Sequence, residues 1–265
     1  MPDDRDLKFA LRLARESIPR LRKAFDSPHQ ITTKPGAGIV TETDRAIEAW
    51  VREEVARHDP SHRVLGEEEG FQGHAHGPCW VVDPVDGTTN FAAGTPLFAF
   101  SLGLIVDGVS SVAVCVDPMR EEIWSAASGR GARLNGIPLR CPEGRLNSES
   151  CLAVPSSRGK RLERVLARVT RRAKLRNTGS TVLNGYVAGR RFAACLATNA
   201  RLWDIAACSL IVLEAGGRVT TDRGRAIFPL SDHPGNVAGK RYQFFCACDN
   251  LHEKILAELI RDEAS

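Results

Sequence analysis

The first quarter of the chain contains two segments in which apolar residues recur every three or four positions. Residues 7–25 carry one such repeat, with Pro19 inside it, and residues 47–55 carry another. This spacing places the apolar side chains on one face of a helix. We therefore predict an amphipathic helix over 7–25, with Pro19 as a potential kink. We predict a second helix that begins near Thr43 or Asp44.

The middle of the chain carries short apolar runs separated by turn residues, a pattern typical of strands. Two of these runs, 63–65 and 80–82, lead directly into acidic residues. Further along, Asp107-Gly108 is a strong hairpin signal between two longer runs. The expected strands of this antiparallel meander are 98–106, 109–116 and 122–126.

The second half of the chain alternates short apolar runs with helical repeats. We expect strands at 150–154, 192–196, 219–221 and 244–248, and helices at 162–173, 204–214 and 251–260. A polar stretch at 142–148 marks a boundary between the two patterns. The sequence thus predicts an N-terminal half over 1–145 and a C-terminal half over 146–265. Mixed strands and helices of this kind indicate an α/β or α+β chain, which we expect to form one integrated catalytic unit.

Composition narrows the class of protein. The chain has 265 residues, of which 43% are hydrophobic and 26% are charged, as expected for a globular protein with a substantial core. The first residues interleave charges with apolar side chains, so they do not resemble a signal peptide, and we expect a cytoplasmic protein. We expect no membrane span, since no apolar run approaches ~18 residues. The eight cysteines include no C-x-x-C pair, and we interpret them as reduced core thiols.

The most informative segment is Asp83-Pro-Val-Asp-Gly-Thr88, which follows a buried apolar run. A strand would deliver Asp83 to its end, Asp86 would follow at the bend, and Gly87 and Thr88 would offer backbone N–H groups. Strand ends and helix starts are places where anionic ligands bind. Carboxylates beside free amides suit Mg²⁺, which binds a few carboxylates together with a substrate phosphate.

Other acidic residues occupy similar positions. Glu67 to Glu69 follow an apolar run, while Asp204 and Asp44 stand where helices are expected to begin. Each has a plainer interpretation when taken alone: the aspartates as helix N-caps and the glutamates as a solvated loop. Together, however, the acidic positions all fall at the ends of predicted elements. This pattern favours convergence on one metal site.

These segments resemble the signature sequences of the inositol monophosphatase family. The matching segments are Asp83-Pro-Val-Asp-Gly-Thr-Thr-Asn-Phe91, Trp203-Asp204-Ile-Ala-Ala with Leu213-Glu-Ala-Gly-Gly217, Gly66-Glu67-Glu68, Val40-Thr-Glu-Thr-Asp44 and Gly129-Arg-Gly-Ala-Arg-Leu-Asn-Gly136. They occur in the family's order and span nearly the whole chain. The resemblance implies a layered αβαβα sandwich of the inositol monophosphatase and fructose-1,6-bisphosphatase type. It also implies a magnesium-dependent, lithium-sensitive phosphatase with two to three Mg²⁺ per site.

The resemblance further implies a role for each acidic residue. Glu67, Asp83 and the Val85 carbonyl would bind the first metal, and Asp83, Asp86 and Asp204 the second. A third, weaker metal would lie near Glu67 and residues 34–38. These residues belong to the loop 32–38, which we predict to be mobile because of its glycines and proline.

The same resemblance implies how substrate and water would be held. Gly87 and Thr88 would bind phosphate through backbone N–H groups, with Asp86 and Asp204 also facing the substrate. Glu67 and the Thr88 hydroxyl would orient the attacking water, with Asp44 hydrogen-bonded to Thr88. We expect direct attack by water, since bound metal lowers the pKa of water and neutralises the phosphate.

The residues that would select the substrate differ from those of inositol-specific family members. Family members specific for inositol carry acidic residues before the Trp-Asp motif, where this chain has Ala193 and Ala197. We expect inositol-1-phosphate or a related sugar or polyol phosphate. Histidinol phosphate, fructose-1,6-bisphosphate and 3'-phosphoadenosine-5'-phosphate remain alternatives. Arg201 is either a solvated loop residue or a contact for a second anionic group.

Partners are suggested by two features. Residues Arg158–Arg176 hold nine basic residues and one acidic residue, which is typical of a solvated face but also allows a nucleic-acid or acidic-protein surface. The segment lacks the interleaved aromatic residues that bind single strands. A regulatory RNA- or protein-binding protein is therefore the non-enzyme alternative. The resemblance also implies a homodimer.

Overall fold

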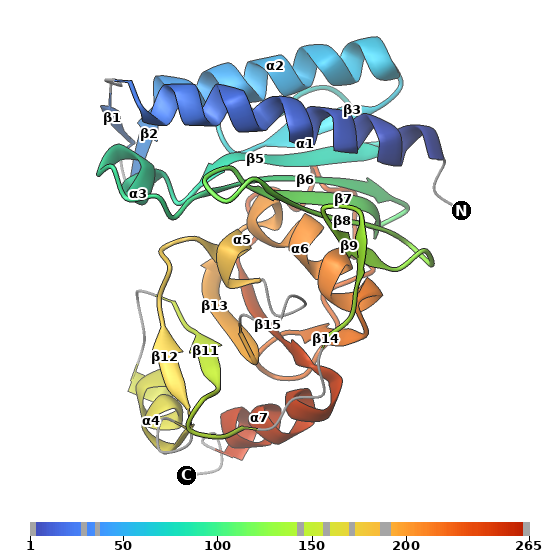
Figure 1. The fold of residues 1–265 in the computed structure, drawn as a ribbon. Coiled ribbons are helices and arrows are strands. Elements are labelled where there is room, and N and C mark those ends of the chain that lie inside the picture. Colours follow the sequence, from blue (N-terminus) through green and yellow to red (C-terminus); the bar gives the residue numbers. More distant parts are fainter. Residues whose placement is uncertain are drawn as a thin grey trace.

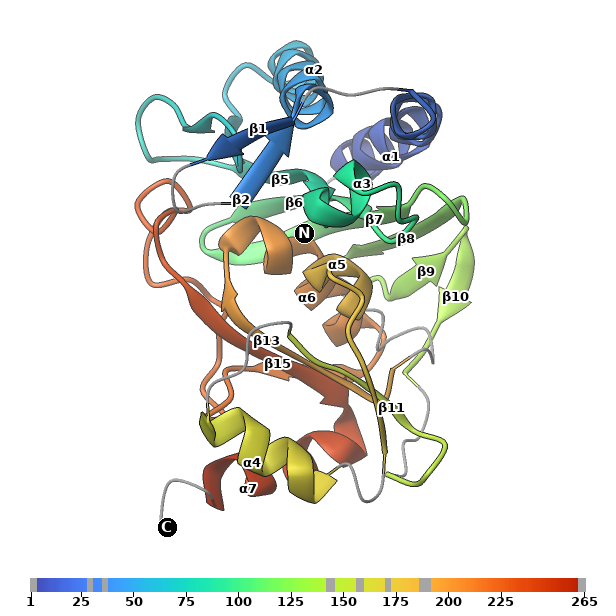
Figure 2. The same ribbon diagram turned by 90° about the vertical axis from the view of Figure 1, so that its left-hand side faces the viewer.

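The computed structural model describes residues 4–27, 31–34, 38–141, 146–155, 160–169, 173–185 and 192–261. Helices and sheets alternate in layers from one side of the molecule to the other (Figure 1, Figure 2). A pair of helices covers an eight-stranded sheet, two further helices lie between this sheet and a five-stranded sheet, and a last pair covers the outer face of the five-stranded sheet. The predicted αβαβα sandwich is confirmed.

The eight-stranded sheet contains the predicted meander, whose hairpin turns at Asp107-Gly108. Both turn residues have positive φ, 49° and 76°, as a two-residue hairpin loop requires. The strand order is β10-β9-β8-β7-β6-β5-β3-β4, and β3 pairs with β5 in parallel. The strands are β3 (Arg63–Gly66), β4 (Gly70–Phe71), β5 (Cys79–Asp86), β6 (Ala99–Val106), β7 (Val109–Asp117), β8 (Glu122–Ala127), β9 (Ala132–Leu134) and β10 (Ile137–Leu139).

The outer face of this sheet is covered by α1 (Asp4–Phe25) and α2 (Glu42–His58), the two helices that the periodicity predicts. Pro19 lies inside α1, which continues through it. Leu13, Leu21 and Val51 are fully buried against the sheet, which accounts for the apolar stripe on each helix.

The prediction of a loop over 32–38 is wrong for its first residues. Ile31–Lys34 forms β1, which pairs in antiparallel fashion with β2 (Gly38–Thr41). Residues 31–33 pair in register with residues 39–41, and β-branched residue types favour strands over loops. Residues 35–37 lie outside the described residues.

The five-stranded sheet has the order β12-β11-β13-β15-β14. Its strands are β11 (Cys151–Ala153), β12 (Lys174–Arg176), β13 (Ala194–Ala200), β14 (Gly217–Thr220) and β15 (Tyr242–Cys248), and its outer face carries α4 (Lys160–Val169) and α7 (Asp249–Arg261). The strand predicted at 192–196 lies two to four residues later, at Ala194–Ala200. The end of the helix predicted at 162–173 lies outside the described residues. Strand β12 was not predicted, because three residues are too few to show an alternation of apolar and polar positions.

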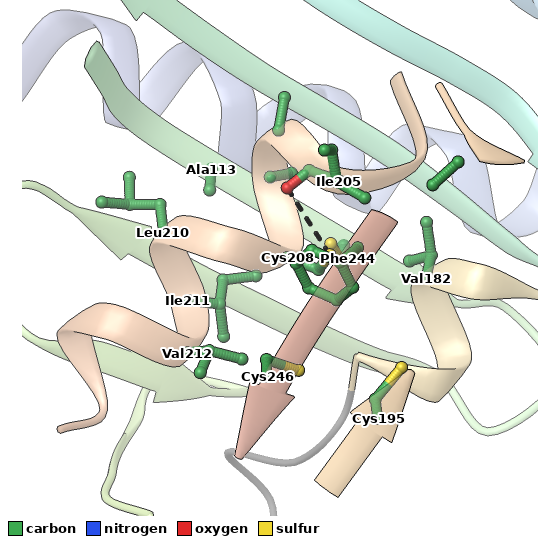
Figure 3. Close-up of a cluster of buried hydrophobic side chains, with 14 of the residues drawn as sticks. Ala113, Val182, Cys195, Ile205, Cys208, Leu210, Ile211, Val212, Phe244 and Cys246 are labelled. Atoms are coloured by element: carbon green, nitrogen blue, oxygen red, sulfur yellow. Dashed lines mark hydrogen bonds between the residues drawn. The ribbon is translucent and has the colours of Figure 1, made fainter. Parts of the chain in front are cut away.

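The layer between the sheets consists of α6 (Leu202–Glu214) and the short α5 (Thr181–Asn184). Helix α6 is apolar on nearly every face, as a helix enclosed on both sides must be. Figure 3 shows Ile205, Cys208 and Val212 of α6 beside Phe244 and Cys246 of β15. This packing joins the two sheets through one continuous core.

The cysteines are core thiols, as predicted. All eight are free, and six of them are buried. Burial raises the pKa of Cys79 and of Cys115 to about 12, which keeps these thiols neutral and unreactive. Figure 3 shows Cys208 donating a weak hydrogen bond to the Ile205 carbonyl.

Among the described residues, none of the helices combines the length and the apolar character needed to cross a bilayer.

One histidine of α7 is buried without charge. His252 is 0% exposed and lies 2.9 Å from the Thr220 hydroxyl. The Thr220 hydroxyl donates its hydrogen to the Thr221 carbonyl, so it accepts from Nε2–H of His252. Burial, with a smaller effect from the charge of Arg218, lowers the pKa of His252 to about 4. The ring is therefore neutral in the folded protein.

We expect His252 to make the fold sensitive to acid. Its pKa falls below the unfolded value of about 6.5, so its contribution is complete above that pH and decreases as the pH falls toward about 4. Replacing His252 with Gln removes this titration. Thermal unfolding at about pH 7 and about pH 5 should show a smaller drop in Tm for the variant than for the unmodified protein. Equal drops would contradict the assignment.

Candidate active site

Three carboxylates converge at one end of the eight-stranded sheet. Asp83, Asp86 and Asp204 each offer an oxygen that lies within 4.8 Å of the other two. Asp83 is buried, whereas Asp86 and Asp204 remain partly exposed. Two of them come from β5 and the third from the first turn of α6. The sequence predicted this convergence, although Asp204 lies more than a hundred residues away along the chain.

A bulge in β5 brings Asp83 and Asp86 to the same side. Residues three apart in a regular strand point to opposite faces of the sheet. Asp83 pairs with Ser101 and Asp86 pairs with Ala99, so the pairing register shifts between them. The extra residue, next to Pro84, turns the strand end. The Val85 N–H donates to Asp83 Oδ1 at 3.1 Å and fixes this carboxylate in the bend.

Close packing of α6 on β6 delivers the third carboxylate. A Cβ atom at Gly103 would lie 3.2 Å from the Ala207 backbone nitrogen, so glycine lets the helix approach the strand. The Ser110 hydroxyl donates to the Ala206 carbonyl at 3.0 Å and ties the same turn to β7. The Arg201 N–H donates to Asp204 Oδ2 at 2.7 Å and orients the carboxylate.

The site concentrates negative charge in a region with little water. Burial is the largest cause that raises the pKa of Asp83, followed by the charges of Glu67, Asp86 and Asp204. Burial also raises the pKa of Asp204, with Asp86 as the next cause. Such carboxylates are stable together only when protons or cations neutralise them. A hard divalent cation with oxygen ligands suits this set.

Glu67 lies near this cluster but is not one of the three close carboxylates. It follows β3 directly, and its charge contributes to the raised pKa of both Asp83 and Asp204. It is therefore placed to extend the acidic site from a second strand end.

Asp86 is also held by α5. Its Oδ2 accepts hydrogen bonds from the Ser180 hydroxyl and from the Val182 N–H, the latter at 2.6 Å. Burial raises the pKa of Asp86, and these donors oppose the shift. Ser180 could not be predicted as a site residue, because a serine before a short helix is typical of an ordinary N-cap.

Asp44 and Thr88 form a buried connection behind the cluster. The Thr88 hydroxyl lies 3.1 Å from Asp44 Oδ1 and 2.9 Å from the Val85 carbonyl. Asp44 Oδ2 accepts from the Thr41 N–H at 2.8 Å, so Asp44 is the third residue of an α2 capping box and not its N-cap. Burial raises the pKa of Asp44, while the bonds from Thr41 and Thr88 oppose the rise.

The turn after Asp86 requires glycine. Gly87 has φ of 96°, and a Cβ atom there would lie 2.9 Å from the Leu97 carbonyl. The short helix α3 (Thr88–Ala92) follows. Its Asn90 side chain donates to the Leu97 and Thr178 carbonyls, both at 2.7 Å, and so fastens this helix to the segment before α5. Nothing in the local pattern signals this contact.

The three residues that the sequence singled out before and at the Trp-Asp motif are Ala193, Ala197 and Arg201. Ala197 is buried on β13 and offers no polar group, and Ala193 is half-buried. Arg201 directs its guanidinium to the Gly239 carbonyl and over the Trp203 ring. It is thus tied to the protein near Asp204, and the simple expectation of a solvated loop arginine is incomplete.

The motif Gly129–Gly136 has a structural explanation. The Gly129 and Gly131 N–H groups each donate to the Glu214 carboxylate at 2.8 Å. Glu214 ends α6, so the motif fastens the far end of that helix to the turn between β8 and β9. The basic segment Arg158–Arg176 lies partly outside the described residues. The loop 35–37, expected near a third metal, lies outside them entirely.

Comparison with known proteins agrees with this geometry. The family model described as "Inositol monophosphatase family" matches residues 3–262. The protein named Nus factor SuhB of Escherichia coli K12 is 35% identical over 241 residues, covering 87% of this chain and 89% of that protein. Nus factor SuhB of Pseudomonas aeruginosa is 36% identical over 242 residues, covering 86% and 89%.

Solved structures show the same fold. The Thermotoga maritima IMPase is 28% identical and aligns with a TM-score of 0.83, covering 98% of both chains. The SuhB protein of Bartonella henselae is 26% identical with a TM-score of 0.84, covering 95% of this chain and 97% of that one. The match over almost the entire length shows that this chain belongs to the inositol monophosphatase family.

Proposed function

We propose that the protein is a magnesium-dependent phosphatase that hydrolyses a small phosphate monoester with a metal-activated water. The observation that carries this proposal is the set of oxygens from Asp83, Asp86 and Asp204 within 4.8 Å of one another. Membership in the inositol monophosphatase family supports it. A phosphate monoester repels hydroxide, so a site that gathers cations supplies what the reaction lacks.

In this proposal, Asp83, Glu67 and the Val85 carbonyl would hold one Mg²⁺, and Asp83, Asp86 and Asp204 would hold a second. A third would bind near Glu67 and the segment 34–38. When bound, the ions lower the pKa of a coordinated water and neutralise charge on the phosphate. The donor set fits Mg²⁺, since every proposed ligand is an oxygen.

Residues of the protein would orient the attacking water and bind the phosphate. The Thr88 hydroxyl has one hydrogen, and Asp44 is a charged acceptor 3.1 Å away. When Thr88 donates to Asp44, its oxygen keeps lone pairs that can accept a hydrogen bond from the attacking water. Glu67 would hold the same water from the other side. The N–H groups of Gly87 and Thr88 would bind the phosphate.

For the substrate we propose inositol-1-phosphate or a related sugar or polyol phosphate. Residues Thr88 to Phe91 favour this branch over the nucleotide branch of the family, as the sequence resemblance implies. Ala197 offers no carboxylate to bind a ring hydroxyl, so histidinol phosphate, fructose-1,6-bisphosphate and 3'-phosphoadenosine-5'-phosphate stay in consideration. We further propose that residues 1–145 and 146–265 act as one catalytic unit and that the protein is a homodimer.

The names of the relatives favour a second candidate function. Several curated relatives are named Nus factor SuhB, which suggests a regulatory binding role on the same scaffold. The basic segment Arg158–Arg176 is one surface on which RNA or an acidic protein could bind. A salt-dependent RNA shift assay, run beside a Mg²⁺-dependent phosphate-release assay, would separate the two functions.

We expect Asp204→Asn to lower turnover by about a thousandfold or more, because it removes one charged metal ligand. The Arg201 N–H bond can be kept by the amide oxygen, so the fold should persist. Glu214→Gln, at the other end of the same helix, is the matched control and should retain turnover. Circular dichroism checks the fold in both variants. Undiminished activity in Asp204→Asn would remove this residue from the proposed site.

Repulsion among the carboxylates predicts that the stability of the metal-free protein depends on pH. The pKa of Asp83 is raised, so the folded protein binds more protons than the unfolded chain above about pH 4. Metal-free protein should therefore lose stability as the pH rises. With a chelator at about pH 8, Asp83→Asn should unfold at a higher temperature than the unmodified protein, and the gain should shrink near about pH 5.

Added Mg²⁺ should reverse this order, because a bound ion stabilises only the protein that can bind it. Millimolar Mg²⁺ should raise the Tm of the unmodified protein and leave that of Asp83→Asn nearly unchanged. A variant that is destabilised without metal, or that responds to Mg²⁺ as strongly as the original, would refute the explanation.

The substrate is tested by a panel of phosphorylated metabolites assayed for released phosphate. We expect the highest kcat/KM for a sugar or polyol monophosphate, because the Arg201 guanidinium near Asp204 is already bonded to the Gly239 carbonyl. A preference for a nucleotide bisphosphate would overturn the proposed substrate class while leaving the metal chemistry in place.

A further inference from the structure

A carboxylate on α2 is fully buried, although the local sequence gives it no evident function. Glu48 is 0% exposed and lies one helical turn after Asp44. Its oxygens accept from the Glu68 N–H at 2.7 Å and from the Glu69 N–H at 3.0 Å. The Arg52 guanidinium donates to Glu48 Oε1 at 2.7 Å and neutralises the charge. These donors satisfy the buried group, which would otherwise destabilise the fold.

The hydrogen bonds enclose the short turn between β3 and β4. Gly66 and Gly70 pair at the base of this turn. Arg52 also donates to the Gly70 carbonyl at 2.6 Å, so one ion pair holds both N–H and C=O groups of the turn. A Cβ atom at Gly66 would lie 2.2 Å from the Glu48 carboxylate, which means that glycine there lets the carboxylate reach the turn.

This turn carries Glu67, which stands between Gly66 and the two N–H groups that Glu48 accepts. Glu67 acts electrostatically on both Asp83 and Asp204, which places its charge near the acidic site. Residues four apart on a helix share a face, so Asp44 and Glu48 project from the same side of α2. Asp44 contacts Thr88, and Glu48 contacts the Glu67 turn. One helix face thus supports both edges of the site.

We propose that Glu48 is a positioning residue that fixes Glu67 for metal binding by holding the backbone N–H groups of Glu68 and Glu69. This inference rests on the proposed function, since it assigns Glu67 to a Mg²⁺ site. Glu48 itself touches neither substrate nor metal. Its effect passes through the backbone of the turn, and the hydrogen bonds from Arg52 hold the Glu48 carboxylate in place.

The chain offers a matched control for the test. Glu214 also accepts two backbone N–H groups of a turn, those of Gly129 and Gly131, but it stands at the end of α6 opposite to Asp204. Glu48→Gln and Glu214→Gln make the same chemical change in two turns. Only the first turn carries a proposed metal ligand.

The experiment is calorimetric titration of each full-length variant with MgCl₂ in the absence of substrate, with Tm measured in a chelator. We expect Glu48→Gln to raise the Kd for Mg²⁺ at least about tenfold, since an amide presents N–H to one of the two donors. Glu214→Gln should bind Mg²⁺ as the unmodified protein does, even where the metal-free Tm values of the two variants fall equally. Unchanged affinity in Glu48→Gln would overturn the proposal.

A second variant covers the case in which Glu48→Gln does not fold. The Cβ atom added in Gly66→Ala would overlap the Glu48 carboxylate and displace it. This variant should therefore also raise the Kd for Mg²⁺. A folded Gly66→Ala protein with unmodified affinity would refute the role of Glu48. If the unmodified protein itself binds no Mg²⁺, the proposed function fails, whereas normal binding by every variant rejects only the positioning role.

Discussion

Repulsion among carboxylates crowded at one end of a sheet is the constraint on which the rest of this structure depends. Asp83, Asp86 and Asp204 bring their oxygens within 4.8 Å, and Glu67 adds a further charge nearby. Without a cation or a rigid surrounding structure, these carboxylates would move apart or bind protons. The surrounding fold prevents separation: a bulge fixes one pair, and a helix enclosed between two sheets delivers the third. The apolar layers thus hold a polar site that would not assemble alone.

The positions of the acidic residues follow from simple packing rules. Glycine at 103 allows α6 to approach β6, and glycine at 87 allows the chain to turn sharply after Asp86. Asp44 and Glu48, behind the site, are buried and accept hydrogen bonds from backbone N–H groups and from the side chains of Thr88 and Arg52. Each of these two carboxylates has its own donors, so the unpaired charge lies with Asp83, Asp86 and Asp204. A site arranged in this way is prepared for cations before they arrive.

Much of this arrangement could be predicted from sequence, and the exceptions have physical causes. The spacing of apolar residues sufficed for α1, and Asp107-Gly108 sufficed for the hairpin of β6 and β7. The ordered acidic motifs predicted that Asp83, Asp86 and Asp204 would converge. Contacts between distant segments could not be predicted. Glu48 resembles any helix-surface glutamate, because its partners are backbone groups about twenty residues away. Strand β1 lies directly before Pro35 and Gly36, which indicate a loop, and so it was not predicted. Strand β12 has three residues, too few to show an alternation of apolar and polar positions.

The central claim is that these carboxylates bind divalent metal together. Crystals of the protein grown with Mn²⁺, which replaces Mg²⁺ and scatters anomalously, would test it directly. The account predicts strong anomalous peaks within bonding distance of Asp83, Asp86 and Asp204, with Glu67 at the edge of the same cluster. An anomalous map without a peak among these carboxylates, at saturating Mn²⁺ and a pH at which they are ionised, would contradict it.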